Sequence, residues 1–513
     1  MISVGAKRLG AIDFEALLFM SENVSLEEKA REQVRLNFEF LKTYSCDKII
    51  YGINTGLGPM AQYKIREEDQ KQLQYNLIRS HSAGAGAIFS EPLARATMLA
   101  RLNSLMRATS GIHPSLPDLL VTLLNKNVSP CIFERGGVGA SGDLVQLAHL
   151  ALNLIGEGEV LYQGTVLPAR EVFDTLGIQP LEIHLREGLA LMNGTSAMTG
   201  VGIVNVIRAG RLIAASVILS AMLNELMGSF DDHFSFELND VKSHKGQAKI
   251  AEHMRQLLAD SKLVRKRPEH LYHRKTNEEV FTDKVQEYYS LRCIPQILGP
   301  VYDTFLQVKE TVENELNSAN DNPVVDHVNQ DVYHGGNFHG DYVSLAMDML
   351  KISIVKLSML SERQLSYLLN DRLNQKLPSF INLATPGLNF GLQGMQFMAT
   401  STVAENQTLA NPVYVHSIPS NNDNQDIVSM GCNAAMMTKK VIDNSYDVLS
   451  VQLLALVQAI DFLQCQSSLS SFTVKVYDEV RQLSSPITED KPRYTDIQKI
   501  SHYLMSLGQS LDL

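Results

Sequence analysis

The sequence predicts a mainly α-helical fold, a long antiparallel central helical bundle with a smaller mixed N-terminal segment that carries loops. Two observations lead to this fold class. Beyond about residue 190, apolar residues recur at three- and four-residue steps over stretches long enough to cross a large bundle. Before that point, glycine-rich loops and short β-like stretches interrupt the helical pattern.

The N-terminal segment, residues 1–190, alternates between helical and irregular patterns. Asp143 follows a loop that contains one proline and four glycines, and an aspartate suits the first turn of a helix. Helical spacing is expected over Phe14–Leu41 and Glu91–Met106, β-like structure over Lys48–Tyr51 and within Gly158–Leu185, and loops over Ile49–Lys64 and Val128–Gly142.

The central segment, residues 191–470, is expected to form the bundle, and residues 471–513 a helical C-terminal tail. No Pro/Ser-rich linker marks a clean boundary between them. Long helices are predicted at Met198–Met227, Val285–Leu316, Asp341–Leu369, Gly391–Thr408 and Val441–Leu463.

Composition excludes several classes of protein. The net charge of −11 argues against a nucleic-acid partner, because phosphate binding needs concentrated Lys and Arg. The five cysteines are odd in number and far apart, which favours reduced thiols in a cytoplasm. The most apolar stretch, Leu212–Leu223, is too short to span a bilayer, and the N-terminus lacks the apolar core of a signal peptide. We therefore expect a soluble cytoplasmic protein with no membrane partner.

The loop Gly136–Leu144 has three interpretations. Its glycines match a Gly-x-Gly-x-x-Gly dinucleotide pattern, but that fingerprint requires a βαβ unit and the next segments are helical. It could be a flexible turn. The third interpretation is chemical: in a tightly bent backbone the Gly142 nitrogen can attack the Ala140 carbonyl, and loss of two waters, one of them carrying the Ser141 hydroxyl, leaves an electrophilic methylidene ring.

Several motifs in register resemble one family. Gly139-Ala140-Ser141-Gly142-Asp143-Leu144 is similar to the signature of the aromatic amino acid ammonia-lyases, which act on histidine, phenylalanine or tyrosine. The resemblance covers most of the chain and includes Tyr51-Gly52-Ile53-Asn54-Thr55-Gly56, Leu191-Met192-Asn193-Gly194-Thr195, Tyr289-Ser290-Leu291-Arg292, Gly336-Asn337-Phe338-His339 and Asn424-Gln425-Asp426.

The resemblance implies a built-in prosthetic group. Ala140, Ser141 and Gly142 would form 4-methylidene-imidazol-5-one (MIO), with no external cofactor, and Asn193 would hydrogen-bond to it. Tyr51 would be the base that takes the β-proton, with Tyr289 in a supporting proton-transfer role. The substrate-binding residues implied are Ser80, His81, Arg292, Asn322, Phe338, Glu405 and Gln425, of which Arg292 suits the substrate carboxylate.

The resemblance implies the reaction class and leaves the substrate open. We expect non-oxidative elimination of ammonia from an aromatic L-amino acid to a trans-α,β-unsaturated acid. Ser80-His81 and Glu405 are similar to the histidine-specific branch and favour histidine to urocanate over tyrosine to p-coumarate. An aminomutase built on the same group, a helical scaffold that has lost catalysis and a dehydrogenase are the rival functions.

No metal is expected at the site. His334, His339 and Asp341, and separately Asp231-Asp232-His233, are weak candidates for ligands because zinc sites need three or four ligands at defined spacing. Related lyases are homotetramers whose sites draw residues from three subunits. We therefore expect a homotetramer in which Tyr51, Tyr289 and Glu405 do not all come from the chain that carries Ser141.

Overall fold

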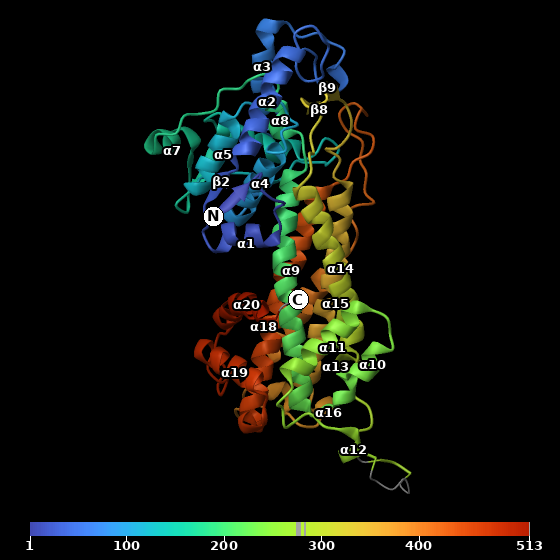
Figure 1. Cartoon of the computed structure of the whole chain (residues 1–513). Coiled ribbons are helices and arrows are strands. Elements are labelled where there is room, and N and C mark those ends of the chain that lie inside the picture. Colours follow the sequence, from blue (N-terminus) through green and yellow to red (C-terminus); the bar gives the residue numbers. More distant parts are fainter. Residues whose placement is uncertain (273–278, 282–283, 512–513) are drawn as a thin grey trace. The chain divides into compact units, whose positions relative to one another are not determined.

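Helices dominate the computed structural model, which describes residues 1–272, 279–281 and 284–511 (Figure 1). Over these residues the chain forms twenty α-helices and nine short strands. The predicted fold class is confirmed.

The chain divides into two compact units. The first contains Met1–Ile207, Gln307–Asp348 and Pro412–Lys439, and the second contains Arg208–Leu306, Met349–Asn411 and Lys440–Leu513. The division falls within four long helices: α9 (Ser196–Met227), α14 (Ile294–Leu316), α15 (Asp341–Leu369) and α18 (Gly431–Leu463). The predicted division into residues 1–190, 191–470 and 471–513 stays a prediction. Compact units collect segments that are distant in the chain, whereas that division follows the order of the sequence.

The first unit surrounds its loops with short helices. These are α1 (Ala11–Phe19), α2 (Glu28–Tyr44), α3 (Glu67–His81), α4 (Glu91–Leu105), α5 (Ser115–Asn125), α6 (Leu144–Leu154), α7 (Ala169–Leu176) and α8 (Glu187–Met192).

Four small sheets lie in the same unit. β1 (Ile2–Val4) pairs in parallel with β2 (Val24–Leu26), and the other pairings are antiparallel. They are β3 (Ala85–Ile88) with β5 (Phe133–Arg135), β6 (Glu159–Tyr162) with both β4 (Ser129–Pro130) and β7 (Thr165–Pro168), and β8 (Val324–Asp326) with β9 (Asp331–Tyr333).

One small core anchors the turn that carries Tyr51. Ile50 and Ile53, on either side of this tyrosine, are buried with Leu41 of α2 and Val325 of β8. Figure 1 shows β8 beside the end of α2. Burial of the two isoleucines fixes the turn, so Tyr51 projects from an anchored segment.

The second unit is built around the remaining lengths of the long helices. Its other helices are α10 (Phe236–Asp240), α11 (Lys245–Leu257), α12 (Arg267–His270), α13 (Tyr289–Arg292), α16 (Asp371–Asn374), α17 (Gln393–Leu409), α19 (Ser471–Leu483) and α20 (Tyr494–Leu507). A buried polar ladder ties α9, α15 and α18 together: Gln364 Nε2 donates to Ser220 Oγ at 3.0 Å, and Gln452 Nε2 donates to Gln364 Oε1 at 2.6 Å. Because each partner is buried and satisfied, the ladder fixes the register of the three helices.

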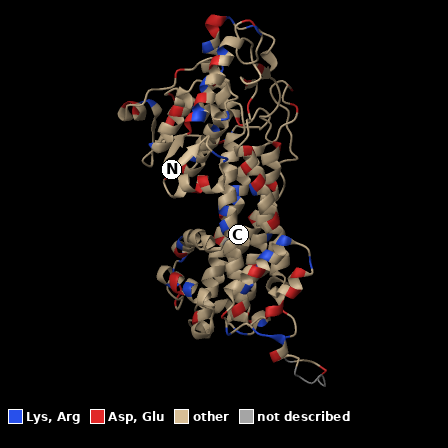
Figure 2. Cartoon of the chain, in the orientation of Figure 1, with Lys and Arg blue, Asp and Glu red and all other residues tan. Residues whose placement is uncertain are grey.

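Among the described residues, two helices are long and apolar enough to cross a membrane by length and composition alone. The most apolar windows of α9 and α18 have mean hydropathies of 1.7 and 1.5, and 83% and 78% of those windows are buried in the protein. Burial on all sides is typical of core helices in a large bundle. Charged residues of both signs are interspersed over the described parts of both units (Figure 2).

Several predicted boundaries are wrong. Lys48–Tyr51 forms no strand, since Ile50 packs into the small core and the segment is a turn. The predicted helix Val285–Leu316 is interrupted at Cys293, where the backbone leaves the helical region, and α14 then begins with Pro295 in its first turn, a position that needs no N–H donor. The helix predicted at Val441 begins at Gly431 instead.

Three N-terminal predictions also miss an element. The pattern Phe14–Leu41 is split by β2 into α1 and α2, and Ser21 before β2 has a left-handed backbone. The β-like patch Gly158–Leu185 forms the β6–β7 hairpin and then the helix α7. The predicted loop Val128–Gly142 contains the short strands β4 and β5. The helix Asp341–Leu369 has the predicted ends.

Candidate active site

A cavity of about 680 Å³ in the first unit gathers most of the predicted site residues. Its lining mixes polar side chains with five leucines, Leu57, Leu73, Leu77, Leu144 and Leu189, which we call the leucine wall. The lining residues include Tyr51, His81, Ser141, Asn193, Asn322, Phe338 and Gln425, together with Leu57, Met60, Tyr63, Leu73, Leu77, Leu144, Leu189, Asn421, Asn422 and Asn424. A cavity of this size and mixed lining suits a small organic ligand.

The Ala140-Ser141-Gly142 loop is held on both sides. Gly142 has a φ of 72° and forms a bridge with Gly194, whose carbonyl accepts from the Asp143 amide at 2.8 Å. A Cβ on Gly142 would overlap the Gly194 carbonyl, so both the backbone conformation and the close approach require glycine here. On the other side, the Met430 amide donates to the Val138 carbonyl at 3.0 Å.

Two side-chain amides converge on Ser141. Asn193 Nδ2 donates to the Ser141 carbonyl oxygen at 3.0 Å, and Gln425 Nε2 donates to the Ser141 hydroxyl oxygen at 3.0 Å. Asn193 is almost fully buried, at 4% exposure. The loop, its crowded glycine and the Asn193 donor fit the cyclised group that the sequence predicts, because a five-membered ring needs a sharp bend and its oxygen, the Ser141 carbonyl oxygen, needs a donor. The Ser141 hydroxyl, to which Gln425 donates, is the group that would leave as water.

Tyr51 enters the same cavity from the turn after Ile50. Its hydroxyl oxygen accepts a hydrogen bond from the Gly58 amide at 3.0 Å. Gly58 has a φ of 54°, in the left-handed region that glycine favours. Since the Gly58 N–H can only donate, it fixes the tyrosine oxygen and leaves the hydroxyl proton free to point elsewhere in the cavity.

His81, the last residue of α3, presents its ring to the cavity. Its Nδ1 lies 3.1 Å from the Leu77 carbonyl and 3.0 Å from the Ser80 hydroxyl, which itself donates to Leu77. A carbonyl oxygen only accepts, so in the neutral ring Nδ1 carries the proton and Nε2 is an acceptor. Ser80 thus contacts the histidine and is not among the residues that line the cavity.

Asn322 and Phe338 also line this cavity. The Asn322 amide donates to Asn193 Oδ1 at 2.8 Å, and Asn322 Oδ1 accepts from the Gly335 amide at 2.8 Å. Phe338 lines the cavity as an aromatic side chain.

A buried carboxyl group directly follows the loop. Asp143 is fully buried, and burial raises the pKa of its carboxyl to about 7 even though Oδ2 accepts from the Met198 amide at 2.7 Å. Among the described residues, Oδ1 has no hydrogen-bond partner. Asp143 therefore ties the first turn of α6 to the first turn of α9.

The other three predicted residues belong to the second unit. Tyr289 and Arg292 line a separate cavity of about 680 Å³, where the Arg292 guanidinium lies 4.6 Å from the centre of the Tyr289 ring. Tyr289 is 69% exposed. Glu405 lies on α17, where its Oε2 accepts from Asn444 Nδ2 at 2.7 Å.

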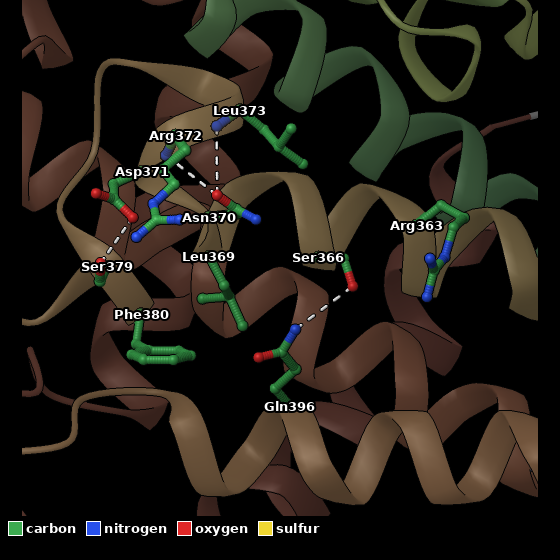
Figure 3. Close-up of a pocket in the computed structure, with 10 residues that line it drawn as sticks. All are labelled: Arg363, Ser366, Leu369, Asn370, Asp371, Arg372, Leu373, Ser379, Phe380 and Gln396. Carbon is green, nitrogen blue, oxygen red and sulfur yellow. Dashed lines mark hydrogen bonds between the residues drawn. The ribbon is translucent and has the colours of Figure 1, made fainter.

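A third cavity, of about 500 Å³, shares residues with the one at Tyr289. Arg363 and Ser366 of α15 line both. Figure 3 shows Ser366 accepting from Gln396, and Ser379 donating to Asp371 on the other side of Asn370. The two cavities of the second unit therefore adjoin at Arg363 and Ser366, and Arg292 lines one of them.

The described residues that line the cavity include no cluster of metal ligands, and some of them were not predicted from the sequence. Among the described residues, no three His, Cys, Asp or Glu side chains gather as a metal site would require. The leucine wall and the asparagines of the 421–424 turn went unpredicted. The turn did carry a signal, since three consecutive residues with a left-handed backbone, Asn421, Asn422 and Asp423, come from a run rich in Asn and Asp.

The fold and this loop define an enzyme of the aromatic amino acid lyase class, and comparison with known proteins agrees. The family model described as aromatic amino acid lyase matches residues 9–482. The histidine ammonia-lyase of Bacillus cytotoxicus is 38% identical, with 100% of this chain and 98% of that protein covered. The tyrosine 2,3-aminomutase of a Myxococcus species is 39% identical, with 98% and 97% covered.

Solved structures lead to the same family. The tyrosine aminomutase from Streptomyces globisporus is 36% identical, superposes with a TM-score of 0.95, and is matched over 99% of this chain and 97% of its own. The chain belongs to the aromatic amino acid lyase family, whose members depend on the MIO group, and it is a carbon–nitrogen lyase by class.

Proposed function

We propose that this chain converts Ala140-Ser141-Gly142 into MIO and uses it to eliminate ammonia from L-histidine, giving urocanate. The observation that carries the proposal is the cavity in which Ser141, held by Asn193 and Gln425, lies with Tyr51 and His81. When formed, the group supplies an electrophile for the substrate amine.

The residues of the cavity would divide the remaining work. The Tyr51 oxygen, fixed by the Gly58 amide, would take the β-proton. Asn193 would donate a hydrogen bond to the ring oxygen, and Asn322 and Phe338 would line the cavity around the substrate. Arg292, which lines the separate cavity of the second unit, would be brought in by assembly of several copies and would bind the carboxylate through two parallel hydrogen bonds, with Tyr289 beside it as a further proton-transfer group.

Histidine is proposed as the substrate on the chemistry of His81 and Glu405. A neutral imidazole can donate its single N–H to Nε2 of a neutral His81, and a protonated imidazole can donate its second N–H to the Glu405 carboxylate. The leucine wall would cover the ring faces. The histidine ammonia-lyase relative from Bacillus cytotoxicus supports this choice.

L-tyrosine is the second candidate, with a lyase or a 2,3-aminomutase outcome. A phenol can donate to the same His81 nitrogen. The aminomutase from Myxococcus and the tyrosine aminomutase structure support it.

The deciding experiment compares the purified enzyme on both amino acids. Near-ultraviolet absorption follows the conjugated acid, and chromatography detects β-amino acid. We expect urocanate from L-histidine, at a kcat/KM above that for L-tyrosine. Faster formation of p-coumarate or of β-tyrosine would replace the proposed substrate and leave the family assignment intact.

The prosthetic group has a separate test. The intact chain should be lighter than its sequence by two waters, about 36 Da, and Ser141→Ala should restore the encoded mass and abolish turnover without unfolding the protein. A wild-type chain of the encoded mass would contradict MIO formation. We also propose a cytoplasmic homotetramer whose sites combine residues of several copies.

A further inference from the structure

The side-chain amide of Asn193 has one orientation that satisfies its neighbours. Its oxygen, Oδ1, accepts from the Asn322 backbone N–H at 2.8 Å. Because that N–H can only donate, the oxygen must face Asn322, and the NH₂ group is left to face Ser141. The orientation of the donor at the prosthetic loop therefore depends on where the Asn322 peptide lies.

The Asn322 peptide is held by a buried arginine. Arg186 is fully buried, and its guanidinium donates to the Asn322 carbonyl at 2.6 Å, to the Ser110 carbonyl at 2.7 Å and to Asp321 Oδ2 at 3.1 Å. The fixed fork of a guanidinium spans two carbonyls and a carboxylate at once, which an ammonium group cannot do.

A second buried arginine holds the backbone of Asn193. Arg101 of α4 is also fully buried and donates to the Asn193 carbonyl at 2.9 Å, to Asn320 Oδ1 at 3.0 Å and to the Ala190 carbonyl. Burial lowers its pKa to about 10, so it stays charged at neutral pH. The guanidinium lies so close to Gly194 that a Cβ there would overlap Nη1.

We propose that Arg101 and Arg186 are positioning residues that together fix the Asn193 amide toward Ser141, Arg101 through the Asn193 carbonyl and Arg186 through the Asn322 peptide. Two buried cations are costly to keep in a core. Each guanidinium makes three hydrogen bonds through its Nη atoms, which hold its partners rigidly, although neither Nε has a partner among the described residues. Rigidity is what a hydrogen-bond donor needs in order to meet a reacting group without rearranging. The inference rests on the proposed MIO function, which Asn193 serves.

The test replaces the Arg186–Asp321 pair by apolar residues of similar size, as Arg186→Met with Asp321→Leu, and separately makes Arg186→Lys and Arg101→Lys. The double variant removes both buried charges, which limits the loss of stability. Arg95→Met is the matched control: Arg95 is a buried arginine of the same helix as Arg101, but it bonds to Leu124 and Asn127.

Three readouts separate positioning from general destabilisation. They are the fraction of chains lighter by two waters, kcat and KM taken separately, and the thermal unfolding midpoint. We expect the Arg186 and Arg101 variants to lose about tenfold or more in kcat with KM changed by less than about threefold, and to contain a smaller mature fraction. Arg95→Met should lower the midpoint comparably and leave kcat and the mature fraction as in wild type.

Arg186→Lys and Asn193→Ala can also be combined in a double-mutant cycle. If the arginines act through Asn193, adding Arg186→Lys to Asn193→Ala should not lower the mature fraction further. An additive loss of the mature fraction overturns the inference. So does a folded Arg186→Met, Asp321→Leu variant with wild-type kcat and mature fraction, or an equal loss of kcat and mature fraction in Arg95→Met. If the double variant does not fold, the lysine variants decide by the same criteria. A wild-type chain of the encoded mass would instead overturn the proposed function itself.

Discussion

At the scale of single residues, binding and chemistry fall on different side chains of the predicted site. Tyr51 lies in the cavity with Ser141, with its oxygen fixed by Gly58. Arg292 lies in the other cavity, stacked on Tyr289, and its Nε is buried without a partner among the described residues. Kinetics can separate the two roles.

We expect Tyr51→Phe to lower kcat by about a hundredfold or more with a small effect on KM, because it removes a proton acceptor and little contact area. Arg292→Lys should mainly raise KM, because an ammonium cannot reproduce two parallel bonds to a carboxylate. Steady-state kinetics on the better substrate measure both. Tyr162→Phe, on the β6–β7 hairpin, is the control and should match wild type. Near-normal kcat in Tyr51→Phe would transfer the role of base to Tyr289.

A buried carboxyl makes a prediction about pH. Glu187 begins α8, the helix that leads to Asn193, and its oxygens accept from the His113 and His184 amides at 2.7 and 2.6 Å. Burial nonetheless raises the pKa of this carboxyl to about 8. Between the unfolded value of about 4.3 and the folded value, the folded chain keeps a proton that the unfolded chain releases, so stability falls as pH rises.

The unfolding midpoint should therefore decline from pH 5.5 to 8, with Glu187 contributing at most about 1.4 kcal/mol per pH unit. Glu187→Gln should make the decline shallower. Glu182→Gln is the control, because Lys71 lowers the pKa of Glu182 and this carboxyl titrates below the window. Calorimetric scans across the pH series provide the measurement, and a slope in Glu187→Gln as steep as in wild type would contradict the role of Glu187.

At the scale of elements, helices were predictable where one apolar pattern runs without interruption. Asp341–Leu369 is such a stretch, and α15 has the predicted ends. The first turns of α18 were missed because Gly431, Ala434 and Ala435 are small, and small residues pack closely without an obvious apolar stripe. Pro295 did mark the start of α14, but the apolar spacing on both sides hid it.

The site was predictable only where its residues sit in motifs. Ser141, Asn193 and Gln425 were found through their short sequence contexts, and the structure brings them within hydrogen-bond distance. Leu73 and Leu189 have no such context, because a leucine lining a cavity and one in the core have the same local pattern. Arg101 and Arg186 carried a weak signal, a charge among apolar residues, whose partners are distant in sequence.

Substitution of Gly142 can separate the effect of its left-handed backbone from the effect of its close contact with Gly194. Gly142→Ala should prevent loss of the two waters and abolish turnover, because its Cβ would overlap the Gly194 carbonyl. Gly164→Ala is the control: its φ of 77° is close to the 72° of Gly142, and nothing lies within 4 Å of the added Cβ. It should cost about 1–2 kcal/mol of stability and mature fully by intact mass. Full maturation of Gly142→Ala would show that this contact is dispensable.

At the scale of the whole molecule, the predicted site is divided between the two units. Tyr51, His81, Ser141 and Asn193 belong to the first unit, and Tyr289, Arg292 and Glu405 to the second. Large apolar side chains remain exposed on α15 and α17, including Tyr342 and Ile352 of α15 and Phe397 of α17, at 75%, 47% and 65%. Exposed apolar surface of this kind favours assembly with further copies, which could supply the second group of residues to the first.

Complementation tests this shared site. Chains with Ser141→Ala and chains with Arg292→Ala should each be inactive. After 1:1 mixing and co-refolding, a site that draws these residues from two chains is intact in about a quarter of cases, so about 25% of wild-type activity should return. Ser141→Ala mixed with Tyr51→Phe is the internal control, because one chain contributes both residues to one cavity and mixing should restore nothing. Light scattering gives the oligomeric state. An active monomer, or no recovery for the Arg292 pair despite verified subunit exchange, would show that each chain builds its site alone.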